Sequence, residues 1–237
     1  MELGTPKVYI KDVSELEGEA FAKAYKAMTP ERRAKIDRLK SEGDRKRSLG
    51  AGMLIEEIKS DFGISARVFE DKNGKPDFKG GGYHISISHS GDYAIAAVSH
   101  DIIGCDIEKL NRNNRQLISI ARKHYSEAEK KLLGLCEPLG EGDEAETEAL
   151  AKNETVTETC DETETKVGTG NQAEAKAGAK EEEILRIWVK KEAIAHLSGE
   201  GLKGLKGFDS CDEETYEFYY PEAPDGYFIA VVTYKEK

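Results

Sequence analysis

The chain has 237 residues, of which 38% are hydrophobic and 34% charged, enough for one large domain or two small ones. Its formal net charge of −11 comes from one segment, because residues 137–183 hold 15 acidic and 4 basic residues while the rest carries 31 of each sign. No apolar run reaches the ~20 residues of a membrane span or forms a signal peptide, and the four scattered cysteines fit free thiols, so we expect a cytoplasmic protein without membrane partners.

The first part of the chain alternates between helix and strand signals. Thr29 and Pro30 are typical of a helix start, because threonine caps exposed N–H groups and proline fits the first turn. Apolar residues between Ala51 and Ile58 recur at helical spacing and predict a helix face turned toward the core. The predicted elements are a strand over 8–10, helices over 14–27, 30–39 and 44–59, a strand over 66–70 and a turn over 72–76.

The middle of the chain favours β-structure. Residues 84–88 alternate between polar and apolar, residues 93–99 are rich in strand formers, and Ser90-Gly91-Asp92 is typical of a hairpin turn. The later predicted elements are a strand over 102–107, one helix over 117–135 or two helices broken near Tyr125, a helix over 184–197, and strands over 215–220 and 227–234.

The acidic segment has an unusual composition. Residues 137–183 contain no aromatic residue and consist mainly of Glu, Thr, Ala, Gly and Lys. Such a segment buries too little apolar surface to offset the entropy lost on ordering. We therefore expect a disordered or loosely helical insertion on the surface.

Two of the predicted strands resemble each other. Residues 93–99 (YAIAAVS) and 227–233 (YFIAVVT) each follow a turn with Gly and Asp, and each lies downstream of an amphipathic helix. The echo indicates an α+β fold of two similar halves about a pseudo-twofold axis, with a site in the cleft between them. Independent use of the same strand-forming residues explains the echo equally well.

Two clusters of charged residues suggest a metal site. On an extended strand Asp106 and Glu108 project from the same face, and their carboxylate oxygens suit Mg²⁺. On the last predicted helix Glu192 lies one turn after Trp188, where it can complete a metal site or accept a proton. Its neighbour Lys191 can neutralise a phosphate. Taken singly, an acidic strand end and a solvated helix face explain these residues more simply.

Two further features suggest a phosphorylated ligand. Ser88 and His89 end a strand before a glycine turn and can donate to a phosphate, although a lone histidine there is more often structural. Residues 31–47 hold eight basic and four acidic side chains, an excess that fits a phosphate site, an exposed helix face or a nucleic-acid patch. We do not expect nucleic acid, because no aromatic residues interleave the patch and no recognition motif is present.

The order of these segments resembles the motif series of the surfactin-type 4'-phosphopantetheinyl transferases. The resemblance covers nearly all of the chain except residues 137–183, and its most specific part is the pair Gly-x-Asp-x-Glu and Trp-x-x-Lys-Glu. The matching segments are Thr29-Pro30-Glu31-Arg32-Arg33, Arg47-Ser48-Leu49, Gly74-Lys75-Pro76, Ile87-Ser88-His89-Ser90, Ile103-Gly104-Cys105-Asp106-Ile107-Glu108, Trp188-Val189-Lys190-Lys191-Glu192-Ala193 and Gly199-Glu200-Gly201-Leu202.

The resemblance implies a monomer of two α+β halves, residues 1–105 and 106–237, with the acidic insertion in the second half. Coenzyme A, the co-substrate, would occupy the cleft between them. Side chains expected to contact its nucleotide and phosphates are Arg32, Lys35, Ser48, Lys75, Ser88, His89 and His196. His196 stands where relatives commonly carry lysine, so it would bind phosphate when protonated and make activity depend on pH.

The resemblance also implies roles for the acidic residues. Mg²⁺, which Mn²⁺ can replace, would be held by Asp106, Glu108 and Glu192 against the coenzyme A pyrophosphate. Glu192 and Lys191 would be catalytic. Glu192, directly or through a metal-bound water, would be the base, and Lys191 would stabilise the leaving phosphate.

The implied reaction moves 4'-phosphopantetheine from coenzyme A to a serine of an apo carrier protein and releases 3',5'-adenosine bisphosphate. The carrier can be of the acyl, peptidyl or aryl kind, and the sequence does not distinguish them. Two alternatives remain open: a catalytically silent module that binds coenzyme A or a nucleotide, and a metal-binding structural protein with an acidic interaction segment.

Overall fold

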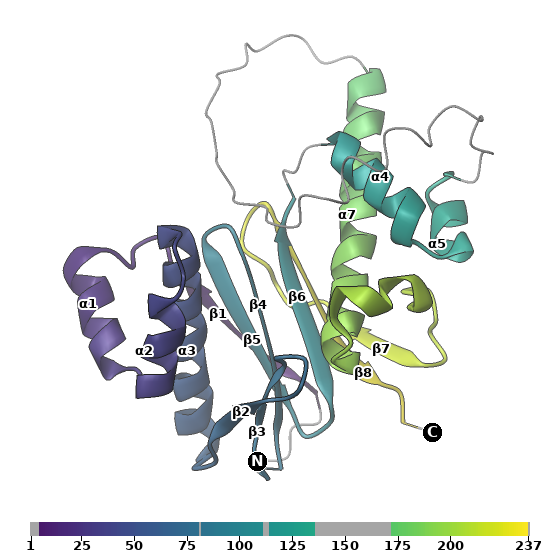
Figure 1. Cartoon of the computed structure of the whole chain (residues 1–237). Helices are drawn as coiled ribbons and strands as arrows, with labels where there is room; N and C mark the ends of the chain where they lie inside the picture. The colour runs from purple at the N-terminus through teal and green to yellow at the C-terminus, as the bar shows by residue number, and fades with distance from the viewer. Residues whose placement is uncertain (1–4, 81, 111–113, 136–171, 237) are drawn as a thin grey trace.

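The computed structural model describes residues 5–80, 82–110, 114–135 and 172–236, and it has the expected α+β class (Figure 1). The elements up to residue 109 are β1 (Lys7–Asp12), α1 (Gly18–Ala27), α2 (Pro30–Asp37), α3 (Glu42–Phe62), β2 (Val68–Glu70), β3 (Pro76–Phe78), β4 (His84–Ser90), β5 (Tyr93–Ser99) and β6 (Ile103–Lys109). The later elements are α4 (Asn114–His124), α5 (Glu127–Leu132), α7 (Gln172–Ser198), the 3-10 helix η1 (Gly201–Gly207), β7 (Tyr216–Tyr219) and β8 (Tyr227–Tyr234).

Two three-stranded antiparallel sheets form the centre of the described fold. One has the strand order β1-β5-β4 and the other β6-β8-β7, while β2 and β3 pair as a separate hairpin. In both three-stranded sheets the strand that comes last in the chain lies in the middle. β6 runs without a break across the boundary expected between residues 105 and 106.

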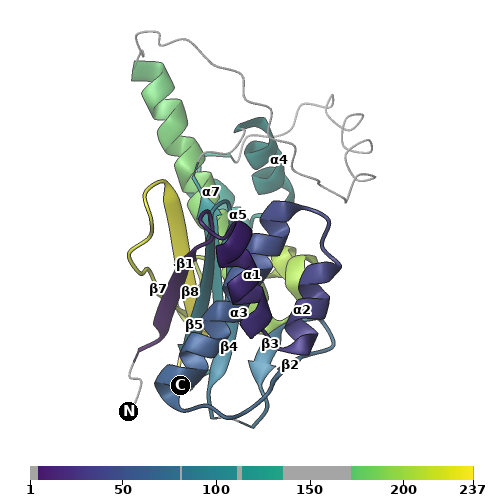
Figure 2. The ribbon, with the colours of Figure 1, turned by 90° about the vertical axis from the view of Figure 1, so that its left-hand side faces the viewer.

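Alternating side chains of β5 separate two cores. Ala94, Ala96 and Val98 belong to the core that contains the buried side chains of α3. Ile95 and Ala97 belong to a second core with residues of β6 and β8. A further core joins α7 to β8. The layers therefore run from α3 through the two sheets to α7 (Figure 1), and in the turned view of Figure 2 helices α1 to α3 face the viewer.

Several helix ends follow directly from the sequence. The Thr29 side chain accepts a hydrogen bond from the Arg32 N–H at 3.2 Å, so α2 starts at Pro30 as expected. Of the two alternatives for residues 117–135, the pair of helices broken near Tyr125 is confirmed, because α4 ends at His124 and Ser126 caps α5. None of the helices in the described part of the chain is both long enough and apolar enough to cross a membrane.

The start of α7 corrects the sequence interpretation. Residues 172–183 belong to the segment expected to be disordered or loosely helical, with the regular helix starting at 184, but they form the first turns of α7. Their composition explains the difference, because alanine, glutamate and lysine have high helix propensity and can extend a helix without being buried. The rest of the expected insertion lies outside the described residues. The sequence patterns also gave no sign of β3 or η1.

Candidate metal and phosphate site

Three carboxylates converge between β6 and α7. One ligand oxygen each from Asp106, Glu108 and Glu192 lies within 4.8 Å of the others. Asp106 and Glu108 are buried, at 3% and 8% exposure, and Glu192 is half-buried. The structure thus brings together the three residues that the sequence suggested as metal ligands, although 84 positions separate Glu108 from Glu192.

A glycine on β6 allows this approach. Gly104, Asp106 and Glu108 alternate with Ile103, Cys105 and Ile107, and the apolar set fills the core between the sheets. A Cβ atom at Gly104 would overlap the Ala193 carbonyl oxygen of α7. The helix backbone therefore lies directly on this strand, which places Glu192 beside the two strand carboxylates.

The electrostatics of the cluster favour a bound cation. Burial raises the pKa of Asp106 well above its usual range, and the charges of Glu192 and Glu108 raise it further. Asp106 Oδ2 is buried and accepts no hydrogen bond from the described residues. The three carboxylates offer only oxygen ligands, and Asp106 Oδ2 is available to a ligand. This arrangement fits a hard divalent ion such as Mg²⁺ or Mn²⁺.

Serines of β4 hold two of these carboxylates. The Ser88 hydroxyl donates to Asp106 Oδ1 at 2.5 Å, and the Ser90 hydroxyl donates to Glu108 Oε2 at 2.5 Å. Ser88 was expected to contact a nucleotide, whereas here its hydroxyl proton is directed to a carboxylate. Ser90 was not expected in the site. The alternation of serines along the predicted strand was the signal that could have indicated it.

Lys191 does not join the cluster. Its side chain is fully buried, its Nζ lies 2.9 Å from Glu129 Oε2 on α5, and it also donates to the Phe208 carbonyl oxygen. Lys191 is therefore engaged in an ion pair with Glu129, and its expected contact with a phosphate stays a prediction. Helix geometry accounts for the separation, since consecutive residues point roughly 100° apart, so that Lys191 faces α5 while Glu192 faces β6.

Three of the expected phosphate ligands lie close enough for their charges to interact. The pKa of His196 is lowered to about 4 by burial and then by the charges of Lys75 and His89. Desolvation and then Arg47 also lower the pKa of His89, although part of that side chain is exposed. Lys75 Nζ donates to the Leu197 carbonyl oxygen of α7 at 3.0 Å. His196 is therefore neutral at pH 7 and would bind a phosphate there as a hydrogen-bond donor.

The remaining expected ligands lie on α2 and α3. Lys35 Nζ pairs with Glu70 Oε1 at 2.7 Å, with both side chains about half exposed. Burial lowers the pKa of Arg32. Ser48 is buried at 7% exposure, and its hydroxyl has no hydrogen-bond partner among the described residues. A buried hydroxyl in this state is suited to a bound ligand.

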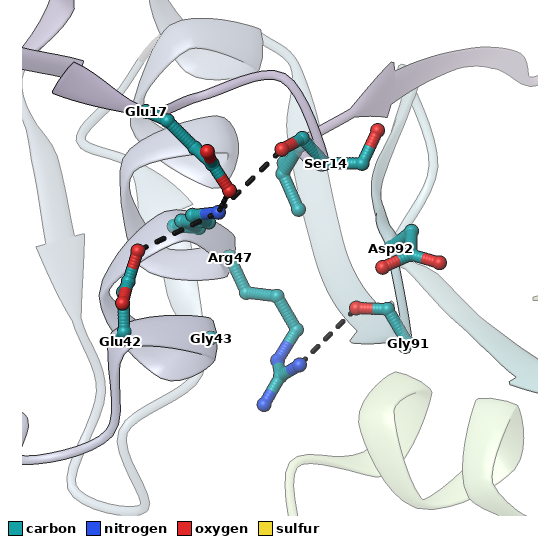
Figure 3. A pocket seen from close by; sticks show the side chains of 9 residues that line it. Ser14, Glu17, Glu42, Gly43, Arg47, Gly91 and Asp92 are labelled. Atoms are coloured by element: carbon teal, nitrogen blue, oxygen red, sulfur yellow. Dashed lines mark hydrogen bonds and ion pairs between the residues drawn. The ribbon is translucent and has the colours of Figure 1, made fainter.

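A pocket of about 400 Å³ lies at the turn that follows Ser90. Figure 3 shows the Arg47 side chain in it, donating to the Gly91 carbonyl oxygen at 3.1 Å. The same wall holds Lys46, which pairs with Glu17 at 2.5 Å and Glu42 at 3.6 Å. The pocket therefore has mixed charge, and none of the three clustered carboxylates lines it.

Comparisons with known proteins do not assign this site. The sequence matches no model of a known protein family and no curated protein. The basis for a function is therefore the chemistry of the site itself.

Proposed function

We propose that this protein is a Mg²⁺-dependent 4'-phosphopantetheinyl transferase of the surfactin type. Coenzyme A would be the donor, a serine of an apo carrier protein the acceptor, and 3',5'-adenosine bisphosphate the second product. The observation that supports this most is the convergence of Asp106, Glu108 and Glu192 within 4.8 Å from two distant elements. A buried like-charge cluster of this kind is costly unless a cation binds there.

The three carboxylates would hold Mg²⁺, which when bound supplies positive charge at a diphosphate. Glu192 is the most exposed of the three and is therefore the one placed to accept a proton from an incoming serine hydroxyl. Lys75 and His89 supply positive charge or N–H donors for further phosphate oxygens, and the Ser48 hydroxyl supplies a donor. Phosphoryl transfer relies on this kind of positioning rather than on a covalent intermediate.

The topology supports the two-half arrangement that goes with this activity. Each three-stranded sheet is built from a strand, a helix that packs on it and a hairpin, and both have the same strand order. We propose that the two units, β1 to β5 and β6 to β8, are similar halves about a pseudo-twofold axis. Because one chain would supply both sides of the site, a monomer suffices.

One observation favours a second candidate function. Burial of Lys191 in an ion pair removes one of the two expected catalytic side chains from the site. A protein with the remaining groups could bind coenzyme A and a divalent cation without transferring anything. This alternative is a catalytically silent coenzyme A-binding module.

The test is transfer to a panel of apo acyl, peptidyl and aryl carrier proteins in the presence of coenzyme A and Mg²⁺, followed by intact mass spectrometry. We expect a carrier to gain the mass of one phosphopantetheine, and Glu192→Gln to reduce the rate about 100-fold or more. Asp101→Asn, which changes an exposed carboxylate near the start of β6, is the matched control and should keep the rate. Coenzyme A binding without any mass gain would support the silent module instead.

A further inference from the structure

Three alternate serines of β4 face β6. Ser86, Ser88 and Ser90 are all buried, at 1%, 9% and 8% exposure. β4 and β6 are edge strands of different sheets, so their contact does not use a regular backbone ladder. Serine side chains supply part of the connection. The Ser86 hydroxyl oxygen accepts the Cys105 N–H at 3.0 Å, and the Ser90 hydroxyl oxygen accepts the Lys109 N–H at 3.3 Å.

The Ser90 hydroxyl has a defined direction. Its oxygen accepts from the Lys109 backbone, and its proton goes to Glu108 Oε2 at 2.5 Å. A glutamate side chain has three rotatable bonds, and the Ser90 bond fixes one carboxylate oxygen on the β4 side. One oxygen of the same carboxylate lies within 4.8 Å of a ligand oxygen of Asp106 and of Glu192, so the group that Ser90 holds is the one that enters the cluster.

We propose that Ser90 is a positioning residue that sets the metal affinity of the cluster by orienting Glu108. This inference rests on the proposed metal site and adds to it a residue that contacts neither metal nor substrate. Groups that hydrogen-bond to metal ligands restrict their orientation before the ion arrives, and their loss typically weakens metal binding about 10–100-fold. Ser90 and Ser86 make the same type of backbone contact, but among the described residues only Ser90 of these two also reaches a clustered carboxylate.

The difference between these two serines provides a matched experiment. Mn²⁺ affinity of the full chain, measured by electron paramagnetic resonance without coenzyme A, is compared among wild type, Ser90→Ala and Ser86→Ala. We expect Ser90→Ala to weaken Mn²⁺ binding about tenfold or more and Ser86→Ala to change it less than about twofold. Ser90→Thr keeps the hydroxyl donor and should remain within about threefold of wild type.

Thermal unfolding in EDTA shows whether the two alanine variants lose similar stability, since each loses one link between β4 and β6. Equal weakening of Mn²⁺ binding in both variants would assign the effect to the strand contact and overturn the positioning role. An unchanged affinity in Ser90→Ala, or a loss in Ser90→Thr as large as in Ser90→Ala, would overturn it as well. If the wild-type chain bound no Mn²⁺, the proposed metal site itself would fail, which is a different result from either of these.

Discussion

Two buried carboxylates contact consecutive residues of α7, and their surroundings are opposite. Glu129 is fully buried and accepts three hydrogen bonds, from the Ser126 N–H, the Ser210 N–H and the Lys191 ammonium. Asp106 is almost as buried but lies beside two like charges, and its Oδ2 accepts no hydrogen bond within the described residues. Both oxygens of Glu129 accept hydrogen bonds from the protein, whereas one oxygen of Asp106 is left for a ligand.

The difference concerns two consecutive residues of α7, Lys191 and Glu192, each of which contacts one of these carboxylates. The Lys191–Glu129 pair connects α7 to α5 and to the segment around Ser210, so its charges are balanced inside the protein. Glu192 turns to a cluster in which two further carboxylates, Asp106 and Glu108, are buried. Two neighbouring motif residues therefore have different surroundings, and the stability of variants should reveal what each contacted carboxylate contributes.

The largest expected effect comes from breaking the balanced pair. Glu129→Ala leaves the Lys191 ammonium buried without its counter-charge, and we expect a loss of about 3–5 kcal/mol in the free energy of unfolding. Urea unfolding measures this loss. Glu127→Ala is the matched control on the same helix, since the Glu127 side chain is 84% exposed and its pair with Lys130 is a surface one. A similar small loss in both variants would show that the Lys191–Glu129 pair is not a buried structural contact.

Replacing Asp106 should change the free energy of unfolding in the opposite direction. Burial and like charges raise the pKa of Asp106, so its charged form destabilises the metal-free fold at neutral pH. We expect Asp106→Asn to raise the free energy of unfolding in EDTA by about 1 kcal/mol, because the amide needs no counter-charge. Wild type should gain about 2.7 kcal/mol at a Mn²⁺ concentration 100 times its Kd, and Asp106→Asn should lose that gain.

Thermal or urea unfolding with and without Mn²⁺ measures both effects. A wild-type chain whose stability ignores Mn²⁺, together with a destabilised Asp106→Asn variant, would mean that this cluster is a structural feature like the Glu129 pair. Asp106 and Glu129 would then both be structural carboxylates.

The sequence predicted the cluster of three carboxylates better than the Lys191–Glu129 pair, for a physical reason. Asp106 and Glu108 share a strand face by simple alternation, and the motif series linked them to Glu192. The partner of Lys191 depended on how α5 packs against α7, and Ser126 and Glu129 suggested only a capping box. The alternation of serines placed Ser90 on the same face as Ser88, but its contact with Glu108 depends on how β4 packs against β6 in the tertiary structure. The start of α7 is twelve residues earlier than predicted, because a low apolar content left disordered and loosely helical states open, whereas helix propensity favours the helix.

The effect that should be smallest at pH 7, and grow as the pH falls, lies one turn beyond Glu192, where α7 meets Lys75 and His89 instead of carboxylates. His196 has a pKa of about 4 in the folded chain because of burial, Lys75 and His89, against 6.5 for an ordinary histidine. Between pH 6.5 and 4 the unfolded chain binds a proton at this residue that the folded chain does not. The free energy of unfolding should therefore decrease as the pH decreases, by up to about 1.4 kcal/mol for each pH unit in this window. His196→Gln should lack this contribution.

The difference between wild type and His196→Gln in urea unfolding at pH 7, 6 and 5 isolates this residue, because His89 and the carboxylates titrate in both proteins. Coenzyme A should reduce the slope of that difference, since bound phosphates favour the protonated imidazole and raise its folded pKa. A slope unchanged by coenzyme A would place His196 away from the phosphates. A slope absent even without coenzyme A would mean that this end of α7 does not bury the histidine, and the contrast between its carboxylate-rich and cation-rich turns would disappear.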